Sequence, residues 1–476
     1  MARITTNKKM SFRQTGDGSG SSRKTLKSTS QISTEERKQS RIHSQLTHQK
    51  NKRNQLLEQL KRRKVSSLDD DHSIPFALLV QQVMELEHLK PRLQALQRCR
   101  AILSNCNEET MNNIVSNQPF LFMLHQLLTS KYSELQLEAA WCITNIAAMR
   151  EDVVAFCIPT LVNLLSGSMT NVILQEQCVW ALGNISLGSI VDSNIPYSTV
   201  VIQNGLVPHL VNLIRACRVN EIVKTCLWCI SNLIKNELMH EKTAIEVNKQ
   251  GIWNALGSLY DPIMYLLLKR QLTDEEMIVD LLFALSYLTA LQIQLMEEQT
   301  RIMLEQVGLV SIKYLDRNGN SKPIIRMLGN IFSKCNLFSM LSQDHSLQLM
   351  SLLMNIECKD KEWCYMMSNI SSHEEIVDVL VGEFHLMPIM YDLLIPMLKG
   401  QNEPTLDHIR EVVITLINLM TACQNKHLSW QIVDTIQLYV APLFQHDQDG
   451  EFWVVLEGFL NYLKGVYVTC GQKSLS

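Results

Sequence analysis

The sequence predicts an all-α protein, a solenoid built from repeated helical units. The chain of 476 residues is 46 % hydrophobic but only 6 % aromatic, a composition that favours Leu-, Ile- and Met-rich helices over sheets. Apolar residues recur at helical spacing, and one short motif returns about every 44 residues along the chain. A period in the low forties is typical of units of two or three helices that stack on one another.

The repeated motif places an indole four residues before a carboxamide, as in WCITN, WALGN and WCISN. Residues i and i+4 lie on one face of a helix, so each motif helix should present the ring and the amide side by side. Between the motifs, QNGLVPHLVNLI carries a Gly break before an apolar helix, and SLGSIVDSNIPYS is a polar insertion expected on a turn. The last position of the motif recurs at Asn105, Asn145, Asn184, Asn232, Tyr287, Asn330, Asn369, Asn418 and Asn461.

Composition divides the chain into three parts. Residues 1–34 are rich in Ser, Thr, Lys and Gly, which predicts a disordered tail. Residues 35–72 read as a basic helix followed by an acidic linker, and residues 73–470 as the helical solenoid, with about nine repeats.

Charge is unevenly distributed between these parts. Residues 1–64 hold 17 of the 44 Lys and Arg residues but only 4 of the 47 Asp and Glu residues, so the repeats are acidic. An acidic body favours basic ligands, and the basic segment should become ordered on an acidic partner. A nonspecific solvated tail and a nucleic-acid-binding tail are the alternatives for that segment. Residues 35–64 contain no aromatic residue, which argues against single-strand binding and direct nucleic-acid contact.

The repeated indole and amide allow two interpretations. A tryptophan every forty residues is often packing between repeats. However, asparagine is poor in a helix interior and unfavourable to bury unpaired, so its repetition suggests that it reaches beyond its helix. Stacked repeats would align the pairs along a groove, where amides can bond an extended backbone and indoles can hold Lys or Arg side chains. The residues therefore predict a groove for an extended basic peptide.

No motif for an enzyme, a cofactor or a metal site is evident. The sequence lacks a Gly-rich phosphate loop, HExxH and a nucleophile elbow, so we expect a non-enzyme without cofactor or metal. Cys226 and Cys229 form a CxxC pair that we interpret as two reduced core thiols. No apolar run reaches the roughly 20 residues of a membrane helix, so we expect no membrane span.

At these motifs the chain resembles the importin-α (karyopherin-α) family of armadillo-repeat nuclear import adaptors, as a divergent member. EAAWCITNIAA, EQCVWALGNIS and LWCISNL look like its second to fourth motif helices, and FALSYL and RMLGNI also fit. In that family one repeat has Tyr in place of Asn, as at Tyr287, and the next has Arg in place of Trp, as at Arg326. The resemblance implies a right-handed superhelix of armadillo repeats.

It also implies sites, partners and location. A nuclear localisation signal of a cargo protein would bind at Trp141, Asn145, Trp180, Asn184, Trp228 and Asn232, and a smaller site would include Arg326, Asn330, Tyr365 and Asn369. Importin-β would bind the basic segment, which also occupies the adaptor's own groove when free, and the protein would occur in cytoplasm and nucleus. The basic residues of that segment are Arg37, Lys38, Arg41, Lys50, Lys52, Arg53, Lys61, Arg62 and Arg63.

Two departures from the family pattern concern charge and rings. Relatives carry an acidic residue shortly after the WALGN motif, where this chain has Gly188, and we hypothesise that Glu134 and Glu138 supply part of the missing charge. At the smaller site, Tyr365 and Ile414 stand where Trp is expected. The alternative function is an armadillo scaffold of the same divergent branch, which binds another protein and has no cargo cycle.

Overall fold

The computed structural model describes most of the predicted solenoid. The predicted tail, residues 1–34, and the predicted basic segment and linker, residues 35–72, lie outside the described residues, as does Asn461. The described residues are 74–166, 171–240, 249–269, 275–290, 321–333, 336, 339, 341–357, 359–399, 406–422, 430–444 and 456–460.

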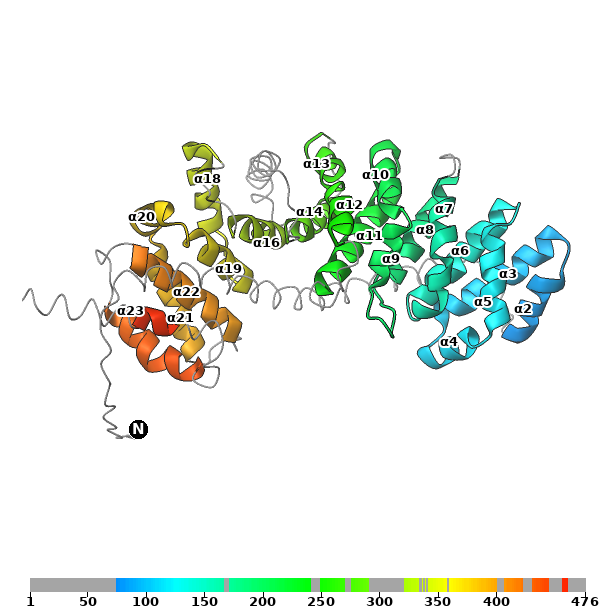
Figure 1. The fold of residues 1–476 in the computed structure, drawn as a ribbon, viewed down its shortest axis with the longest axis horizontal. Coiled ribbons are helices and arrows are strands. Elements are labelled where there is room, and N and C mark those ends of the chain that lie inside the picture. The colour runs from blue at the N-terminus through cyan, green and yellow to red at the C-terminus, as the bar shows by residue number, and fades with distance from the viewer. Residues whose placement is uncertain are drawn as a thin grey trace, which may run out of the picture. The chain divides into compact units, whose positions relative to one another are not determined.

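The described chain is all-helical, as the sequence predicts, and divides into two compact units at residue 370. In the first unit, long helices close each repeat and pack against one another in chain order, α3 on α6, α6 on α8, α8 on α11, and onward to α19 (Figure 1). We call these the inner helices. They are α3 (Leu89–Asn105), α6 (Ser133–Ala147), α8 (Val172–Ile185), α11 (Asn220–Met239), α14 (Glu275–Ala290), α16 (Ser321–Phe332) and α19 (Lys361–Ile370).

Outer helices precede most of the inner helices in the described ranges, so that α4, α5 and α6 form one repeat and α9, α10 and α11 another. Side-chain oxygens begin several of the helices, because the first N–H groups of a helix have no partner within it. Asn107, Asn117 and Asn171 cap α4, α5 and α8 in this way. The outer helices are α2 (Phe76–Glu85), α4 (Glu108–Val115), α5 (Gln118–Leu128), η1 (Asp152–Cys157), α7 (Ile158–Leu164), α9 (Tyr197–Gln203), α10 (Leu206–Ala216), α12 (Lys249–Gly257), α13 (Tyr260–Lys269) and α18 (Gln343–Met354).

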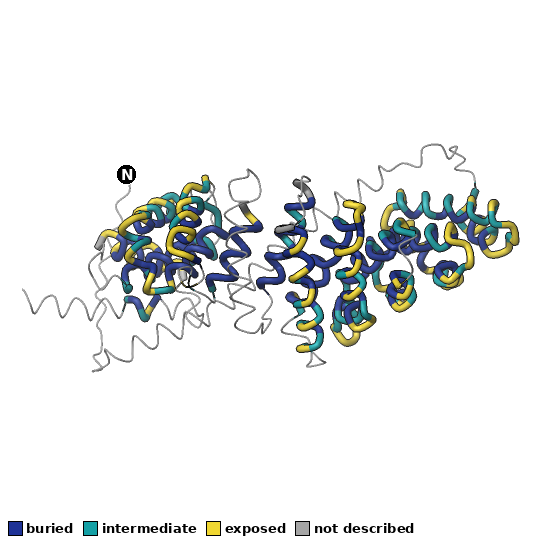
Figure 2. Tube along the Cα trace, turned by 90° about the horizontal axis from the view of Figure 1, so that it is seen from above, coloured by how far each residue is buried: buried dark blue, intermediate teal, exposed yellow. Residues whose placement is uncertain are grey.

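The core of the first unit follows the inner helices. Figure 2 shows buried residues concentrated along them, with exposed residues on the outer helices. Cys226 and Cys229 lie in α11 without exposed surface, and burial raises the pKa of both thiols, which confirms their interpretation as core residues. Each inner helix packs against the inner helices before and after it, so apolar residues are needed on more than one side, and these helices lack a continuous polar face.

Two predicted breaks between helices are confirmed. Gly205 has φ +90°, a left-handed conformation that favours glycine, and it separates α9 from α10 inside QNGLVPHL. The insertion after α8 forms a turn in which Ser189 pairs with Pro196 by a short antiparallel bridge. The turn thus brings the chain back to α9 close to the end of α8.

The described part of the second unit contains α20 (Glu374–Gly382), α21 (Leu386–Leu398), α22 (Leu406–Ala422), α23 (Trp430–Thr435), and the short helices η3 (Ile436–Val440) and η4 (Ala441–Phe444). Of the described helices, none is by itself long and apolar enough to cross a membrane. Only α20 and α21 taken together meet that criterion, and the chain bends by 79° between them.

Candidate functional site

Three adjacent inner helices bring the predicted major-site residues together. We call Trp141 and Asn145 of α6, Trp180 and Asn184 of α8, and Trp228 and Asn232 of α11 the Trp–Asn row. The three indoles are half-buried, whereas the three asparagines are buried. The rings therefore keep accessible surface beside a line of amides, the arrangement that the four-residue spacing predicts.

The asparagine amides also join neighbouring repeats. Nδ2 of Asn184 donates to the carbonyl oxygen of Thr144 at 3.1 Å, and Nδ2 of Asn232 donates to that of Gly183 at 3.2 Å. Each acceptor immediately precedes the motif asparagine of the previous repeat. These bonds explain why a residue that is unfavourable inside a helix recurs here, because each amide donates to a carbonyl of the preceding inner helix.

The same bond continues outside the Trp–Asn row. Nδ2 of Asn330 donates to the carbonyl oxygen of Ser286 at 2.9 Å, and Nδ2 of Asn369 donates to that of Gly329 at 2.7 Å. The asparagines therefore do reach beyond their own helices, as the sequence predicts, and the groups that they contact are backbone carbonyls of the neighbouring repeat. Two polar atoms of the row stay without a hydrogen-bond partner among the described residues, Nδ2 of Asn145 and Oδ1 of Asn184.

The indoles pack closely between repeats with part of their surface free. The ring centroids of Trp180 and Trp228 lie 5.9 Å apart at an interplanar angle of 48°. A Cβ on Gly183 would lie 2.5 Å from Cζ3 of Trp228, so the glycine of WALGN is what allows this approach. Gly329 stands in the same relation to Tyr365, where a Cβ would lie 3.1 Å from Cδ1 of the ring.

The chain's own arginine occupies the face of the first indole. The guanidinium carbon of Arg100, on α3, lies 4.3 Å from the ring centroid of Trp141, and its Nε lies 2.6 Å from Oε2 of Glu138. These two side chains are only 11 % and 9 % exposed. Glu138, one of the two acids expected to bind a ligand cation, is therefore already paired. The sequence interpretation missed Arg100, although its basic side chain precedes the motif position Asn105 by five residues.

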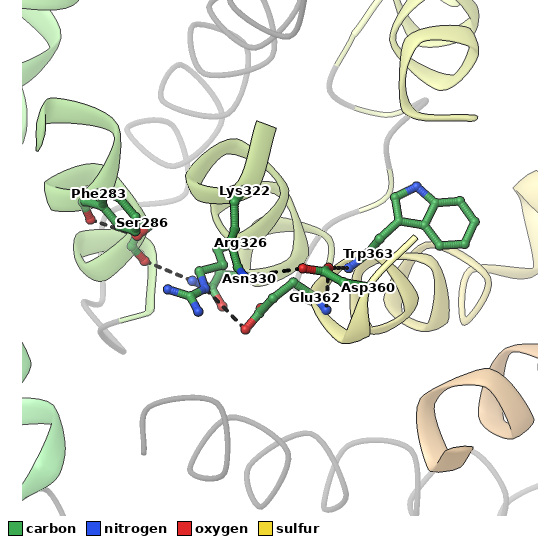
Figure 3. A network of polar contacts seen from close by, with 8 residues as sticks. All are labelled: Phe283, Ser286, Lys322, Arg326, Asn330, Asp360, Glu362 and Trp363. Atoms are coloured by element: carbon green, nitrogen blue, oxygen red, sulfur yellow. Dashed lines mark hydrogen bonds and ion pairs between the residues drawn. The ribbon is translucent and has the colours of Figure 1, made fainter. Parts of the chain in front are cut away.

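The residues of the predicted smaller site lie deeper than those of the row. Nε of Arg326 lies 3.2 Å from Oε1 of Glu362 in an ion pair between α16 and α19, and both side chains are 6 % exposed (Figure 3). Tyr365 is buried. A second ion pair joins Nζ of Lys322 on α16 to Oδ2 of Asp360, the residue just before α19, at 3.5 Å (Figure 3). Arg326 and Lys322 are thus paired with acids of the chain itself. The residues of the smaller site are buried, and peptide binding there stays a prediction.

Comparisons with known proteins agree with this architecture. A profile of the Armadillo/beta-catenin-like repeat matches residues 149–187 and 194–235. An engineered protein of known structure superposes with a TM-score of 0.52 at 18 % identity, covering 82 % of this chain and 98 % of its own. A chain from a study of cadherin and beta-catenin superposes with a TM-score of 0.60 at 12 % identity, covering 81 % and 78 %. These likenesses concern the fold alone.

Curated relatives point to one family. Importin subunit alpha-9 of Arabidopsis thaliana is 27 % identical over 51 % of this chain and 44 % of its own length. Importin subunit alpha-1b of Oryza sativa subsp. japonica is 28 % identical over 44 % of this chain and 36 % of its own. The chain is an armadillo-repeat protein that is distantly similar to importin-α subunits over about half of its length. It spans less than half the length of these two importin-α relatives.

The remaining predictions concern the fold, the basic segment and metal binding. The solenoid of armadillo repeats is confirmed. The candidate importin-β-binding residues, Arg37 to Arg63, lie outside the described residues. No group of three or more His, Cys, Asp or Glu residues in the described ranges is placed to hold a metal ion.

Proposed function

We propose that this chain binds extended Lys/Arg-rich peptides along the Trp–Asn row and acts as a nuclear import adaptor. The observation that carries the proposal is three half-buried indoles on adjacent inner helices, with Trp180 and Trp228 5.9 Å apart. An aliphatic stem of Lys can lie against an indole while the ammonium gains roughly 0.5–2 kcal/mol from the ring face.

The protein contains an internal example of this chemistry. Arg100 stacks on Trp141 and pairs with the carboxylate of Glu138 at the same time. A ligand arginine or lysine on Trp180 or Trp228 would make the same kind of contact. Because Arg100 fills the first position, a bound peptide has the surface of Trp180 and Trp228 as its main anchor.

The unpaired amide atoms support recognition of a peptide backbone. Oδ1 of Asn184 is buried and without a partner among the described residues, and such an acceptor is unfavourable until an N–H reaches it. A peptide N–H alongside the row would supply that donor. Nδ2 of Asn184 already donates one hydrogen bond to Thr144, so the amide serves both the fold and the ligand.

The proposal further assigns importin-β to residues 35–64 and cargo with basic signals to the row. A fluorescein-labelled Lys/Arg-rich peptide tests the cargo half by anisotropy. Trp180→Leu keeps an apolar side chain for packing but removes the ring face, and we expect it to weaken binding at least tenfold. Trp253→Leu is the matched control, because Trp253 is half-buried on α12, outside the row. Equal affinities of the Trp180 variant and the wild type would contradict the peptide site.

The second candidate is an armadillo scaffold that binds another protein without a cargo cycle. The paired acids favour it, because Glu138 and Glu362 already hold Arg100 and Arg326 and are not free for a basic cargo. Capture of purified importin-β by residues 30–65 separates the two functions. The adaptor requires capture, and its absence would leave the scaffold.

A further inference from the structure

Gly188 has no side chain, and the carboxylate of Glu151 occupies the space beside it. We propose that Glu151 binds a ligand ammonium beside Trp180 and Asn184, and so sets where along the row a basic peptide has its preferred lysine. This inference rests on the proposed peptide-binding function and goes beyond it, because it names the charge that would decide the register of the ligand.

Position 188 lies at the end of the column that Trp180 and Asn184 begin. The three residues are spaced by four, and backbone hydrogen bonds from Leu187 to Asn184 and from Gly188 to Ile185, each 3.2 Å, continue the turn past the end of α8. The carbonyl oxygen of Gly188 accepts hydrogen bonds from Nδ2 of Asn236 and from the backbone N–H of Tyr197, both at 3.0 Å. Gly188 is thus held in place beside the row.

The side chain of Glu151 fills the space that a side chain at 188 would need. A Cβ built on Gly188 would lie 2.4 Å from Cγ of Glu151 and 2.6 Å from its Oε1. Real Cβ atoms do not approach other atoms so closely, so the present position of the Glu151 side chain requires glycine at position 188. The carboxylate comes from the turn after α6, one repeat earlier, and reaches the end of α8.

The neighbouring charges leave this carboxylate available. Arg150 is turned to Asp152, with Nε and Nη2 at 3.0 and 2.9 Å from its two oxygens, and Nη1 lies 2.7 Å from Oδ1 of Asn112. Within the described ranges, no ion pair joins Glu151 to a basic residue, and its side chain is half-buried. Burial, and after it the negative charges of Asp152 and Glu151, raise the pKa of Tyr197. The charge of Glu151 also acts on Arg150, so these residues set one cation against two carboxylates.

Three other acids of the inner helices are already engaged. Glu138 pairs with Arg100, and Glu362 pairs with Arg326. Glu237 accepts hydrogen bonds from Ser198 at 2.6 Å and from Thr199. Among the described residues no side chain forms a hydrogen bond or ion pair with the carboxylate of Glu151, which distinguishes it from these three acids. A basic ligand on Trp180 would supply such a partner.

The first experiment measures affinity of the full chain for a fluorescein-labelled peptide with five consecutive lysines. We expect Glu151→Gln to weaken binding about tenfold, the low end for a lost charge-assisted hydrogen bond. Glu109→Gln is the control, because it removes the same charge from an exposed position on α4 and should leave affinity within twofold. If Glu151→Gln also stays within twofold while Trp180→Leu abolishes binding, Glu151 has no role and only the peptide site remains.

The second experiment exchanges the two positions. Gly188→Asp in the wild type should lower affinity, because the new side chain displaces and repels the carboxylate of Glu151. In the Glu151→Ala background the same substitution should be tolerated and should restore affinity. Equal effects in both backgrounds would overturn the inference. Failure of the wild type to bind any basic peptide would overturn the proposed function together with this inference.

Discussion

Single side chains in this protein combine packing with recognition chemistry, and Trp141 is the plainest case. Its half-buried ring supports the guanidinium of Arg100, which in turn neutralises Glu138. Arg100 lies 41 residues before Trp141 in the sequence, and nothing in the local pattern predicts their contact. Motif spacing predicted which rings share a row, but only the neighbouring helix decided which ring face is already occupied.

Removal of this arginine should destabilise the fold. Arg100→Met keeps the aliphatic stem but leaves the nearly buried carboxylate of Glu138 without its cation, and we expect a loss of about 3 kcal/mol in the free energy of unfolding. Arg150→Met is the control, since the pair of Arg150 and Asp152 is 36 % and 44 % exposed and should contribute less than about 1 kcal/mol. Urea denaturation of the two variants measures the difference, and equal losses would contradict the buried pair.

At the scale of helices, the asparagine amides connect successive inner helices at equivalent points. The connection appears between α6 and α8, α8 and α11, α14 and α16, and α16 and α19. Repeats contact mainly their neighbours, so each such bond contributes to one interface and little to the others. The regular position of the acceptor explains why the motif keeps its amide even where the ring is replaced, as at Arg326.

One of these connections can be tested away from the candidate peptide site. Asn369→Ala removes the bond to the carbonyl oxygen of Gly329 and should lower stability by about 1 kcal/mol. Amide hydrogens at the end of α16 should then exchange faster. Asn204→Ala is the matched control, because its amide is exposed and bonds within its own helix to Val200. Unchanged exchange in α16 would show that the amide does not couple the two helices.

The extended C-terminal part of α11 carries a buried acid whose ionisation should affect stability. Burial raises the pKa of Glu237 above its ordinary value of 4.5, and hydrogen bonds from Ser198 and Thr199 oppose part of that rise. The folded state thus holds the proton more tightly than the unfolded state. The contribution of Glu237 to the free energy of unfolding is therefore largest below pH 4.5, and it falls as the pH rises from there through the folded-state pKa.

Glu237→Gln should remove this component of the pH dependence. Relative to the wild type, the variant should gain stability as the pH rises from 4.5 towards neutrality, which thermal unfolding at a series of pH values measures. Glu221→Gln, an exposed position at the start of the same helix, should not alter the pH profile. A wild-type profile parallel to that of the Glu237 variant would refute the assignment.

The whole molecule joins a basic N-terminal segment to an acidic array of repeats. Of the 44 Lys and Arg residues, 17 lie in residues 1–64. On the proposed function, this segment competes with basic peptides for the Trp–Asn row. Apparent affinity for a peptide is reduced by the fraction of molecules whose row is occupied.

Deletion of residues 1–70 should therefore increase the apparent affinity for a Lys/Arg-rich peptide, by about tenfold if one molecule in ten is open. Addition of the isolated segment in trans should reverse the gain, and the reversal should weaken as salt is raised. A scrambled segment of equal charge is the control for nonspecific attraction. No change on deletion, measured by anisotropy, would exclude competition by the tail.

The sequence by itself determined the fold class, the position of the repeats and the placement of Trp141, Trp180 and Trp228 each beside an Asn on one helix face. Helical periodicity and spacing are local properties, so they can be read along the chain. Tertiary structure alone decided that Asn184 bonds Thr144, that Arg326 pairs with Glu362, and that Glu151 takes the place of a side chain at Gly188. These contacts join residues 36 to 40 positions apart, where only the stacking of helices determines which atoms meet.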